Sequence, residues 1–379
     1  MHHPNTKVIH ITNPSSKMND MIYRRWILAK SAVLGLIGFL PGMGLLWQAP
    51  FAKAAGGLTA EEIFAKAGPS VVQLKSVDSE GSGVSIHDGG WILTNLHVAA
   101  SGTPMTATFS DASGNVVRKV EGATLFRVHP TQDLAILKVD VGGKAPVVAR
   151  IAGVGEVPKP AATCFTISSP AGIAGALTNT ITQGIVSTPR RVLDGQEFIQ
   201  FSAAVNPGSS GGALLDREAR VIGLITSKQE GGEGVGFATP LAGMDWKTFV
   251  EPSKRKGDRD RYKKAIEMAA RAQMSGALSM FGNPGGALPE QLAAAAYYSR
   301  IALTEFPADE AAFQSLIEVY YLAGKQDICL ALAQSAERVT GSSVFLSLQA
   351  RSLDLTGKKD EAFKIYSRVL ECDDGNPRW

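Results

Sequence analysis

Residues 71 to 240 alternate short apolar runs with turns rich in glycine, proline, asparagine and aspartate. The turn His87-Asp88-Gly89-Gly90 lies between two such runs, which is typical of a β-hairpin. Many short strands at this spacing predict an all-β barrel or sandwich, and two groups of about six strands fit two barrels packed together. We expect strands over residues 71–75, 83–86, 91–94, 105–109, 116–120 and 133–139, and then over 164–167, 180–187, 198–204, 221–226 and 235–239.

Helical patterns lie on both sides of the predicted strands. Residues 58–66 have the pattern of a short helix, with Thr59 as its N-cap. Beyond the strands, helical periodicity predicts an all-α region with helices over residues 293–303, 311–322, 327–339, 344–355 and 360–370.

Two turns in the all-α region repeat each other. Gly324-Lys325-Gln326-Asp327 and Gly357-Lys358-Lys359-Asp360 are 33 residues apart, and each separates two predicted helices. This helix–turn–helix spacing resembles tetratricopeptide-like repeats. The resemblance implies about three helical pairs, starting near Asp258, stacked into a small solenoid. A purely structural cap and a surface that binds a protein partner both remain open.

The N-terminus resembles an export signal. Arg24-Arg25 precede an uncharged stretch over residues 31–52, and Ala52-Lys53-Ala54 is a small-x-small cleavage site. We expect a secretory signal peptide cleaved after Ala54 and a periplasmic protein. The alternative is an uncleaved membrane anchor over residues 31–52 with the rest of the chain facing the periplasm.

Composition, net charge and cysteine count argue against several classes of protein. The chain has 379 residues, 45% hydrophobic and 19% charged, which is ordinary for a globular protein of two or three domains. A formal net charge of +3 indicates no nucleic-acid partner, and the charged run over 251–262 is expected to be a solvated linker. Three cysteines, at positions 164, 329 and 372, are not a disulfide framework. With no metal-ligand spacing and no nucleotide fingerprint, we expect no cofactor.

A serine-containing loop is the main candidate for chemistry. In Asn206-Pro207-Gly208-Ser209-Ser210-Gly211-Gly212, glycines allow tight turns and the close approach of another chain segment. A serine in such a turn can stand exposed beside converging backbone N–H groups, as acyl transfer requires. Taken alone, a Gly/Ser tract between two strands is more often only a turn.

A histidine and an aspartate upstream change that interpretation. We expect His97 to end the strand that runs through Thr94-Asn95-Leu96, in a mostly apolar setting where an imidazole is costly unless it is hydrogen-bonded. Asp133 is a lone acid at the head of another apolar strand. The order His97, Asp133, Ser210 is the chymotrypsin-type order of a catalytic triad. It places histidine and aspartate in the first predicted barrel and serine in the second.

Six ordered segments resemble the HtrA/Deg family of trypsin-like serine proteases. They span residues 81–84, 92–98, 133–138, 182–187, 204–212 and 234–240. The resemblance implies a chymotrypsin-like double six-stranded barrel and a serine endopeptidase acting on polypeptides, including unfolded or misfolded proteins. It also implies a homotrimer. The helical repeats stand where many members of the family carry PDZ domains.

The resemblance also assigns roles. Ser210 would be the nucleophile, His97 the general base and acid, and Asp133 the group that orients the imidazole. The backbone N–H groups of Gly208 and Ser210 would form the oxyanion hole. Ser209 departs from the family, which more often has asparagine there.

The specificity pocket should involve Val205, Thr226 and Lys228. Because the family usually presents a small or apolar side chain at the last of these positions, Lys228 would favour a polar or acidic residue before the scissile bond. The alternative is that Lys228 points into solvent.

We therefore expect an N-terminal extension and signal peptide over residues 1–54 and a trypsin-like serine protease domain over 55–250. A charged linker over 251–262 and tetratricopeptide-like repeats over 263–379 would follow. Two other functions stay open: a protease-fold module that binds peptides or acts as a chaperone with weak or latent proteolysis, and an adaptor that recruits a partner through residues 260–379.

Overall fold

The computed structural model describes residues 57–372, except for 78, 144–145, 171–178, 194, 229–233 and 280–289. The predicted signal peptide over 1–54 and the alternative membrane anchor over 31–52 lie outside the described residues. Among the helices that the structure describes, none is both long and apolar enough to cross a membrane.

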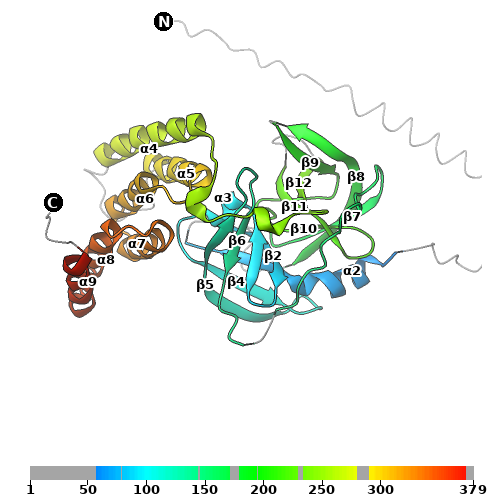
Figure 1. Ribbon diagram of the computed structural model, residues 1–379, viewed down its shortest axis with the longest axis horizontal. Coiled ribbons are helices and arrows are strands. Elements are labelled where there is room, and N and C mark those ends of the chain that lie inside the picture. Colours follow the sequence, from blue (N-terminus) through cyan, green and yellow to red (C-terminus); the bar gives the residue numbers. More distant parts are fainter. Residues whose placement is uncertain are drawn as a thin grey trace, which may run out of the picture. The chain divides into compact units, whose positions relative to one another are not determined.

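Residues 71–138 close into a six-stranded antiparallel barrel (Figure 1). Its strands pair in the order β1-β2-β3-β6-β5-β4. Buried apolar side chains line the short strands, as the alternating sequence pattern predicts. The strands are β1 (Val71–Lys75), β2 (Glu80–His87), β3 (Trp91–Thr94), β4 (Met105–Ser110), β5 (Val116–Val128) and β6 (Ala135–Lys138).

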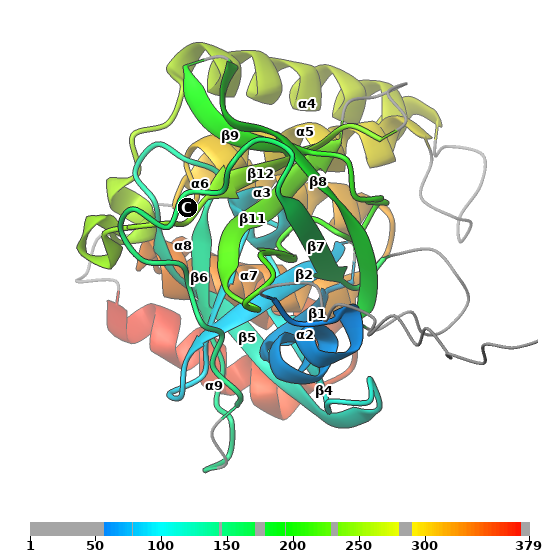
Figure 2. The same cartoon turned by 90° about the vertical axis from the view of Figure 1, so that its right-hand side faces the viewer.

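Residues 163–240 close into another six-stranded antiparallel barrel, paired in the order β10-β11-β12-β9-β8-β7. Figure 2 shows its green strands toward the viewer. The double six-stranded barrel predicted from the sequence is thus confirmed. The strands are β7 (Thr163–Ser168), β8 (Thr180–Leu193), β9 (Gln196–Phe201), β10 (Ala213–Leu215), β11 (Val221–Lys228) and β12 (Gly236–Pro240).

Two local predictions need correction. His97 does not end a strand: β3 stops at Thr94, and His97 lies in the one-turn helix α3 (Leu96–Ala99), whose first turn closes on the Asn95 carbonyl. Asp133 does not head β6, because that strand begins two residues later. Both side chains are therefore carried by segments just outside the sheet, where loop and turn backbone can aim them into a site.

A helix at the N-terminal side of the first barrel matches its prediction. α2 (Ala60–Ala67) is capped by Thr59, whose hydroxyl accepts from the Glu62 N–H while the Glu62 carboxylate accepts from the Thr59 N–H. This reciprocal capping box fixes the start of the helix. The short 3₁₀ turn η1 (Gly68–Ser70) then leads into β1.

Six helices follow the barrels among the described residues, in line with the predicted all-α region (Figure 1). Consecutive helices pack against each other along the chain. Gly324 and Gly357 have φ of 68° and 79°, the left-handed conformation that commonly ends a helix. The tetratricopeptide-like character stays a prediction. The helices are α4 (Arg259–Ser279), α5 (Glu290–Glu305), α6 (Glu310–Leu322), α7 (Gln326–Thr340), α8 (Val344–Leu355) and α9 (Lys359–Cys372).

Three apolar cores hold the described residues together. One core fills the second barrel, around Phe201 and Ile225. Another joins both barrels and α2, with Leu134 on one side and Phe165 on the other, and so fixes how the barrels face each other. The largest is shared between the first barrel and helices α4 to α8.

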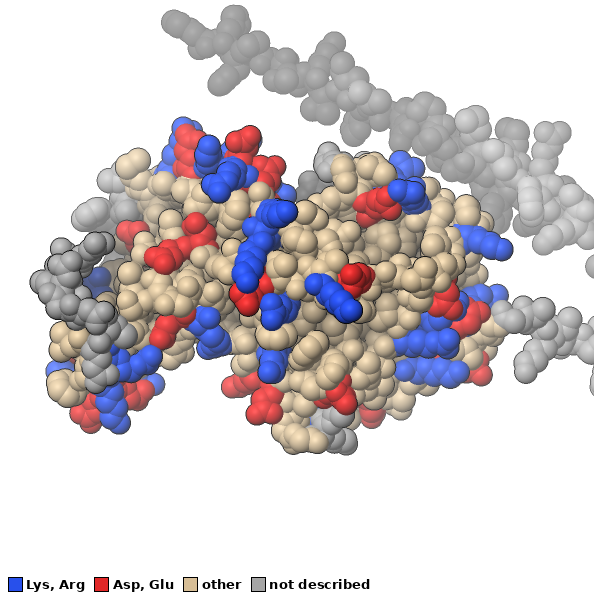
Figure 3. Space-filling view, viewed as in Figure 1, with Lys and Arg blue, Asp and Glu red and all other residues tan. Residues whose placement is uncertain are grey.

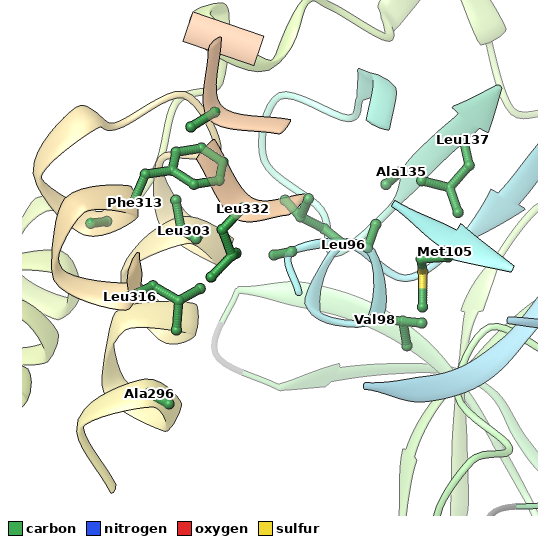
Figure 4. Close-up of a cluster of buried hydrophobic side chains, with 14 of the residues drawn as sticks. Leu96, Val98, Met105, Ala135, Leu137, Ala296, Leu303, Phe313, Leu316 and Leu332 are labelled. Carbon is green, nitrogen blue, oxygen red and sulfur yellow. The ribbon is translucent and has the colours of Figure 1, made fainter. Parts of the chain in front are cut away.

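Figure 4 shows this shared core. Leu96 of α3 and Leu137 of β6 lie on the barrel side, with Leu303, Phe313 and Leu332 on the helical side. The barrel and the helices therefore do not have separate interiors.

The run 251–262 is not a solvated linker along its whole length. It contains the 3₁₀ turn η3 (Pro252–Lys254) and the first residues of α4, and Arg255 is only 9% exposed. The expectation is therefore wrong at Arg255, because three backbone carbonyls surround its guanidinium and replace water.

Candidate active site

The structure brings His97 and Asp133 together. His97 Nδ1 lies 2.6 Å from Asp133 Oδ2, and the His97 backbone N–H donates to Asp133 Oδ1 at 2.9 Å. One carboxylate thus holds both the ring and the backbone of the histidine. A carboxylate at Nδ1 requires the proton there, which leaves Nε2 as the ring nitrogen that can accept a proton.

Thr226 of β11 connects this pair to Ser210. Its hydroxyl donates to Asp133 Oδ2 at 3.2 Å, and its carbonyl accepts from the Ser210 hydroxyl at 3.2 Å. Thr226 is 8% exposed, so both bonds are shielded from water. The Thr226 hydroxyl thus adds a further donor to the aspartate, while its place in a specificity pocket stays a prediction.

Strand β2 of the first barrel holds the serine loop of the second. The Ser82 N–H donates to the Ser210 carbonyl at 2.8 Å, and the Ser82 hydroxyl donates to the Gly208 carbonyl at 2.8 Å. The same hydroxyl accepts from the Ser169 N–H at 2.8 Å. Two carbonyls of the loop are thereby fixed by one residue of the other barrel.

Glycine is required at position 211. Its φ is 83°, and an added Cβ would lie 2.0 Å from the Ser82 carbonyl oxygen and 2.4 Å from Thr94 Oγ1. Only a residue without a Cβ lets β2 and β3 approach the loop this closely. The three-residue strand β10 begins directly after Gly212.

Ser209, which stands where the family more often has asparagine, is hydrogen-bonded within its own loop and to Ser168. Its side chain is buried, accepts from the Ser168 hydroxyl at 3.0 Å and accepts from the Asn206 N–H at 3.2 Å. Ser209 therefore closes the turn from within rather than facing a substrate.

Two backbone donors of the loop are available. Gly208 has a φ of 88°, and no hydrogen bond between described residues uses the N–H of Gly208 or of Ser210. These are the two groups that the family resemblance assigns to an oxyanion hole.

The pKa values of the pair shift in opposite directions. Burial lowers the pKa of His97, but the charge and hydrogen bond of Asp133 outweigh it, so the pKa of His97 lies above its ordinary value of 6.5. Burial alone would raise the pKa of Asp133, yet the His97 charge and hydrogen bonds from His97 and Thr226 hold that pKa below its ordinary value. The aspartate is therefore ionised at neutral pH.

Other predicted residues are less closely tied to this site. Val205 is half-buried against the core of the second barrel. Lys228 ends β11, and its side chain lies outside the described residues. His87 is exposed and stacks on Trp91. His129 accepts at Nδ1 from the N–H groups of Thr131 and Gln132.

No group of acidic, histidine or cysteine side chains within the described ranges has the arrangement of a metal site. The described thiols, Cys164 and Cys329, are buried, and burial raises the pKa of each to about 12. Neither thiol is a nucleophile at neutral pH.

The chain is similar in sequence to known trypsin-like serine proteases. A family model described as a trypsin-like peptidase domain matches residues 81–224. The serine protease PepD of Mycobacterium tuberculosis is 34% identical over 218 residues, which covers 48% of this chain and 44% of PepD. A DegP-like protein of Pseudomonas putida, named a periplasmic serine endoprotease, is 35% identical over 173 residues, covering 44% of this chain and 34% of the relative. The crystal structure of Deg5 matches with 30% identity and a TM-score of 0.41, covering 48% of this chain and 91% of Deg5.

The chain thus spans less than half the length of these two curated relatives. Two closed six-stranded barrels with a trypsin-like peptidase sequence define a protein of the chymotrypsin-like fold class. Within that class, the chain belongs to the HtrA family of serine proteases.

Proposed function

We propose that this chain is a serine endopeptidase that hydrolyses peptide bonds through an acyl-enzyme formed on Ser210. The observation that carries the proposal is the 2.6 Å contact between His97 Nδ1 and Asp133 Oδ2, because it holds the imidazole in the tautomer with a basic Nε2. In a serine protease such a base stands beside the nucleophile, and Thr226 links the aspartate to Ser210 here.

The chemistry follows from this arrangement. Ser210 Oγ turns from the Thr226 carbonyl toward His97 Nε2, gives up its proton there, and bonds to the carbon of the scissile carbonyl. His97 then protonates the leaving amine, and the C–N bond breaks. Water enters, His97 takes one of its protons, and the resulting hydroxide attacks the ester. The acid product leaves as His97 returns the proton to Ser210 Oγ.

The backbone N–H groups of Gly208 and Ser210 would bind the oxyanion of each tetrahedral intermediate. Removing one such donor from a serine protease costs about 3 kcal/mol of barrier. The bonds from Ser82 to the carbonyls of Gly208 and Ser210 support this role, since they fix the 208–209 and 210–211 peptide units, which flank the unit that carries the Ser210 N–H.

Export to the periplasm is part of the proposal. It is supported by Arg24-Arg25, the uncharged stretch over 31–52 and the site at Ala54, and by the DegP-like relative that is named periplasmic. Unfolded or misfolded polypeptides as substrates, a homotrimer and a protein partner on the helices are carried over from the resemblances alone. Figure 3 shows basic and acidic side chains interspersed on the face it views, which gives no support to a nucleic-acid partner.

The proposal is tested by labelling with a fluorophosphonate probe, which reacts with an activated serine. We expect the full chain to be labelled and to cleave casein, and Ser210→Ala to do neither. Ser342→Ala, in the turn between α7 and α8, is the matched control and should behave as wild type.

A second function is favoured by one observation. The Ser210 hydroxyl donates to the Thr226 carbonyl, a bond that holds it away from a base. A peptide-binding module with latent proteolysis would show native folding, peptide binding and no Ser210-dependent labelling. That outcome would overturn the protease proposal.

A further inference from the structure

The segment that enters the helical region is anchored to the loop that precedes Asp133. Val128 and Val250 exchange both backbone hydrogen bonds at 2.9 Å, and the Lys256 N–H donates to the Pro130 carbonyl at 3.0 Å. Between these anchors lies Arg255, 9% exposed. A buried arginine must be fully hydrogen-bonded to offset its desolvation.

Arg255 donates in two directions. Its Nη1 donates to the carbonyls of His129 at 2.6 Å and Gln132 at 2.9 Å. Its Nε donates to the Thr304 carbonyl at 3.0 Å, in the last turn of α5. Gln132 is the residue immediately before Asp133, so the guanidinium connects the end of α5 to the backbone that carries the aspartate.

The α5 end of this connection is itself held firmly. Glu305 is 5% exposed; it accepts from the Asp258 N–H at 3.0 Å and pairs with Arg261 at 3.2 Å. A Cβ added at Gly257 would lie 2.2 Å from the Glu305 carbonyl oxygen, so the two backbones are in contact. The end of α5 cannot move independently of residues 255–261.

The histidine side of the site rests on the same helices. α3, which carries His97, packs on α5, and Leu96 shares a core with Leu303 and Leu332 (Figure 4). Helix α5 therefore supports the segments of both His97 and Asp133.

We propose that Arg255 is a positioning residue for Asp133, through which the helical region fixes the geometry of the His97–Asp133 pair. This inference rests on the proposed function, since that pair matters for rate only if Ser210 is the nucleophile. Arg255 touches no reacting atom and acts only through the backbone of residues 129–132.

The test compares Arg255→Lys and Arg255→Met in the full chain with Lys254→Ala, which removes an exposed neighbouring cation. Lysine keeps the charge but cannot reach three carbonyls from one planar fork. A mutation far from the reacting atoms that displaces a catalytic group by about 1 Å lowers the rate about 100-fold. We expect kcat on a short peptide to fall about 10- to 100-fold in both Arg255 variants with KM nearly unchanged, and no change in Lys254→Ala.

A second readout does not depend on turnover. NMR titration of His97, assigned with a His97→Gln variant, measures the pKa that Asp133 raises. If Arg255 positions Asp133, the pKa of His97 falls toward 6.5 in both variants. If Arg255 acted only by its charge, removing the charge in Arg255→Met would raise the pKa of His97, and Arg255→Lys would leave it unchanged.

The outcomes separate the two proposals. A wild-type chain without Ser210-dependent labelling would refute the protease, while the titration would still decide the role of Arg255. Folded variants with unchanged kcat, or a His97 pKa that is unchanged or raised, would overturn the inference. If Arg255→Met loses the native circular dichroism spectrum, Arg255→Lys, which keeps the cation and most of the stem, decides the test.

Discussion

At the scale of single residues, the candidate site is a chain of hydrogen bonds that runs across both barrels. Asp133 accepts from two groups of His97 and from the Thr226 hydroxyl, while the Thr226 carbonyl accepts from Ser210. Removing a partner from such a network leaves a shielded charge with fewer donors, which is more costly than the loss of a single neutral hydrogen bond.

Thr226→Val tests the bond between β11 and the aspartate. A hydrogen bond to a charged group contributes about 1.5–3 kcal/mol, so we expect kcat/KM to fall about tenfold. Because Asp133 then has only His97 as a side-chain donor, the pKa of His97 should rise further, and the acid limb of the pH profile should move upward. Thr226→Ser keeps the hydroxyl and is the control. Equal behaviour of the valine and serine variants would contradict the assigned role.

Asp133→Asn should lower the pKa of His97, whereas Thr226→Val should raise it. A general base works in its neutral form, so wild-type kcat/KM should fall as pH drops through the pKa of His97, which lies above 6.5. In the variant the charge that raises this pKa is gone and burial remains, so the midpoint should move to lower pH. Loss of the correct tautomer should also lower kcat about 10⁴-fold.

The exposed Asp140 provides the control for that experiment. Asp140→Asn removes an equal charge just after β6, whereas Asp133 lies just before that strand, and should leave both the rate and the midpoint in place. An unshifted midpoint in Asp133→Asn would show that the aspartate does not set the titration of His97.

At the scale of elements, the sequence predicts much of the fold because periodicity reports which face of an element is buried. It gives ranges for five of the six described helices after the barrels, to within a few residues, and for eleven of the twelve described strands. The helix without a range, α4, lies where the repeat resemblance implies only a first helical pair starting near Asp258. It misses β10, because three residues are too few to show a period, and α3, because a single turn has no repeat to detect. The candidate triad is recognised by motif and order, whereas the roles of Ser82 and Thr226 depend on pairing between distant strands that no local pattern encodes.

Gly211→Ala tests the packing of β2 on the serine loop. An added Cβ would overlap the Ser82 carbonyl at 2.0 Å, so the loop must move away from the first barrel. We expect a loss of about 1–3 kcal/mol in the free energy of unfolding, measured by denaturant titration, together with loss of fluorophosphonate labelling.

Gly195→Ala is the control that separates the backbone strain of a positive φ from the steric overlap of an added Cβ. Its φ is 75°, and an added Cβ would meet no atom of the described residues within 4 Å. In this variant the free energy of unfolding should fall only by the cost of holding a residue with a Cβ in the left-handed conformation, about 1–2 kcal/mol. Fluorophosphonate labelling should be complete. Labelling that survives in Gly211→Ala as well would mean that the loop tolerates the shift.

At the scale of the whole described chain, the helices and the first barrel share one apolar core. Leu96 and Met105 of the barrel belong to the same cluster as Phe313, Leu316 and Leu332 of the helices, and each of these five side chains is almost fully buried. Gly102 has a φ of 81°, and an added Cβ there would lie 2.8 Å from Leu332. A helical region attached in this way cannot be removed without exposing apolar surface of the barrel.

Leu332→Ala tests this coupling. Emptying a buried leucine site costs about 2–5 kcal/mol. Because the site belongs to both parts, hydrogen exchange under native conditions should accelerate in β3 and β6 as well as in α5, α6 and α7, all by a similar factor. Leu355→Ala, at a position 55% exposed in α8, should change protection little. If Leu332→Ala accelerated exchange in the helices alone and left β3 and β6 protected, the barrel would be an independent folding unit. The contacts between α5 and the segment that carries His97 would then not couple the stability of the helices to that of the barrel.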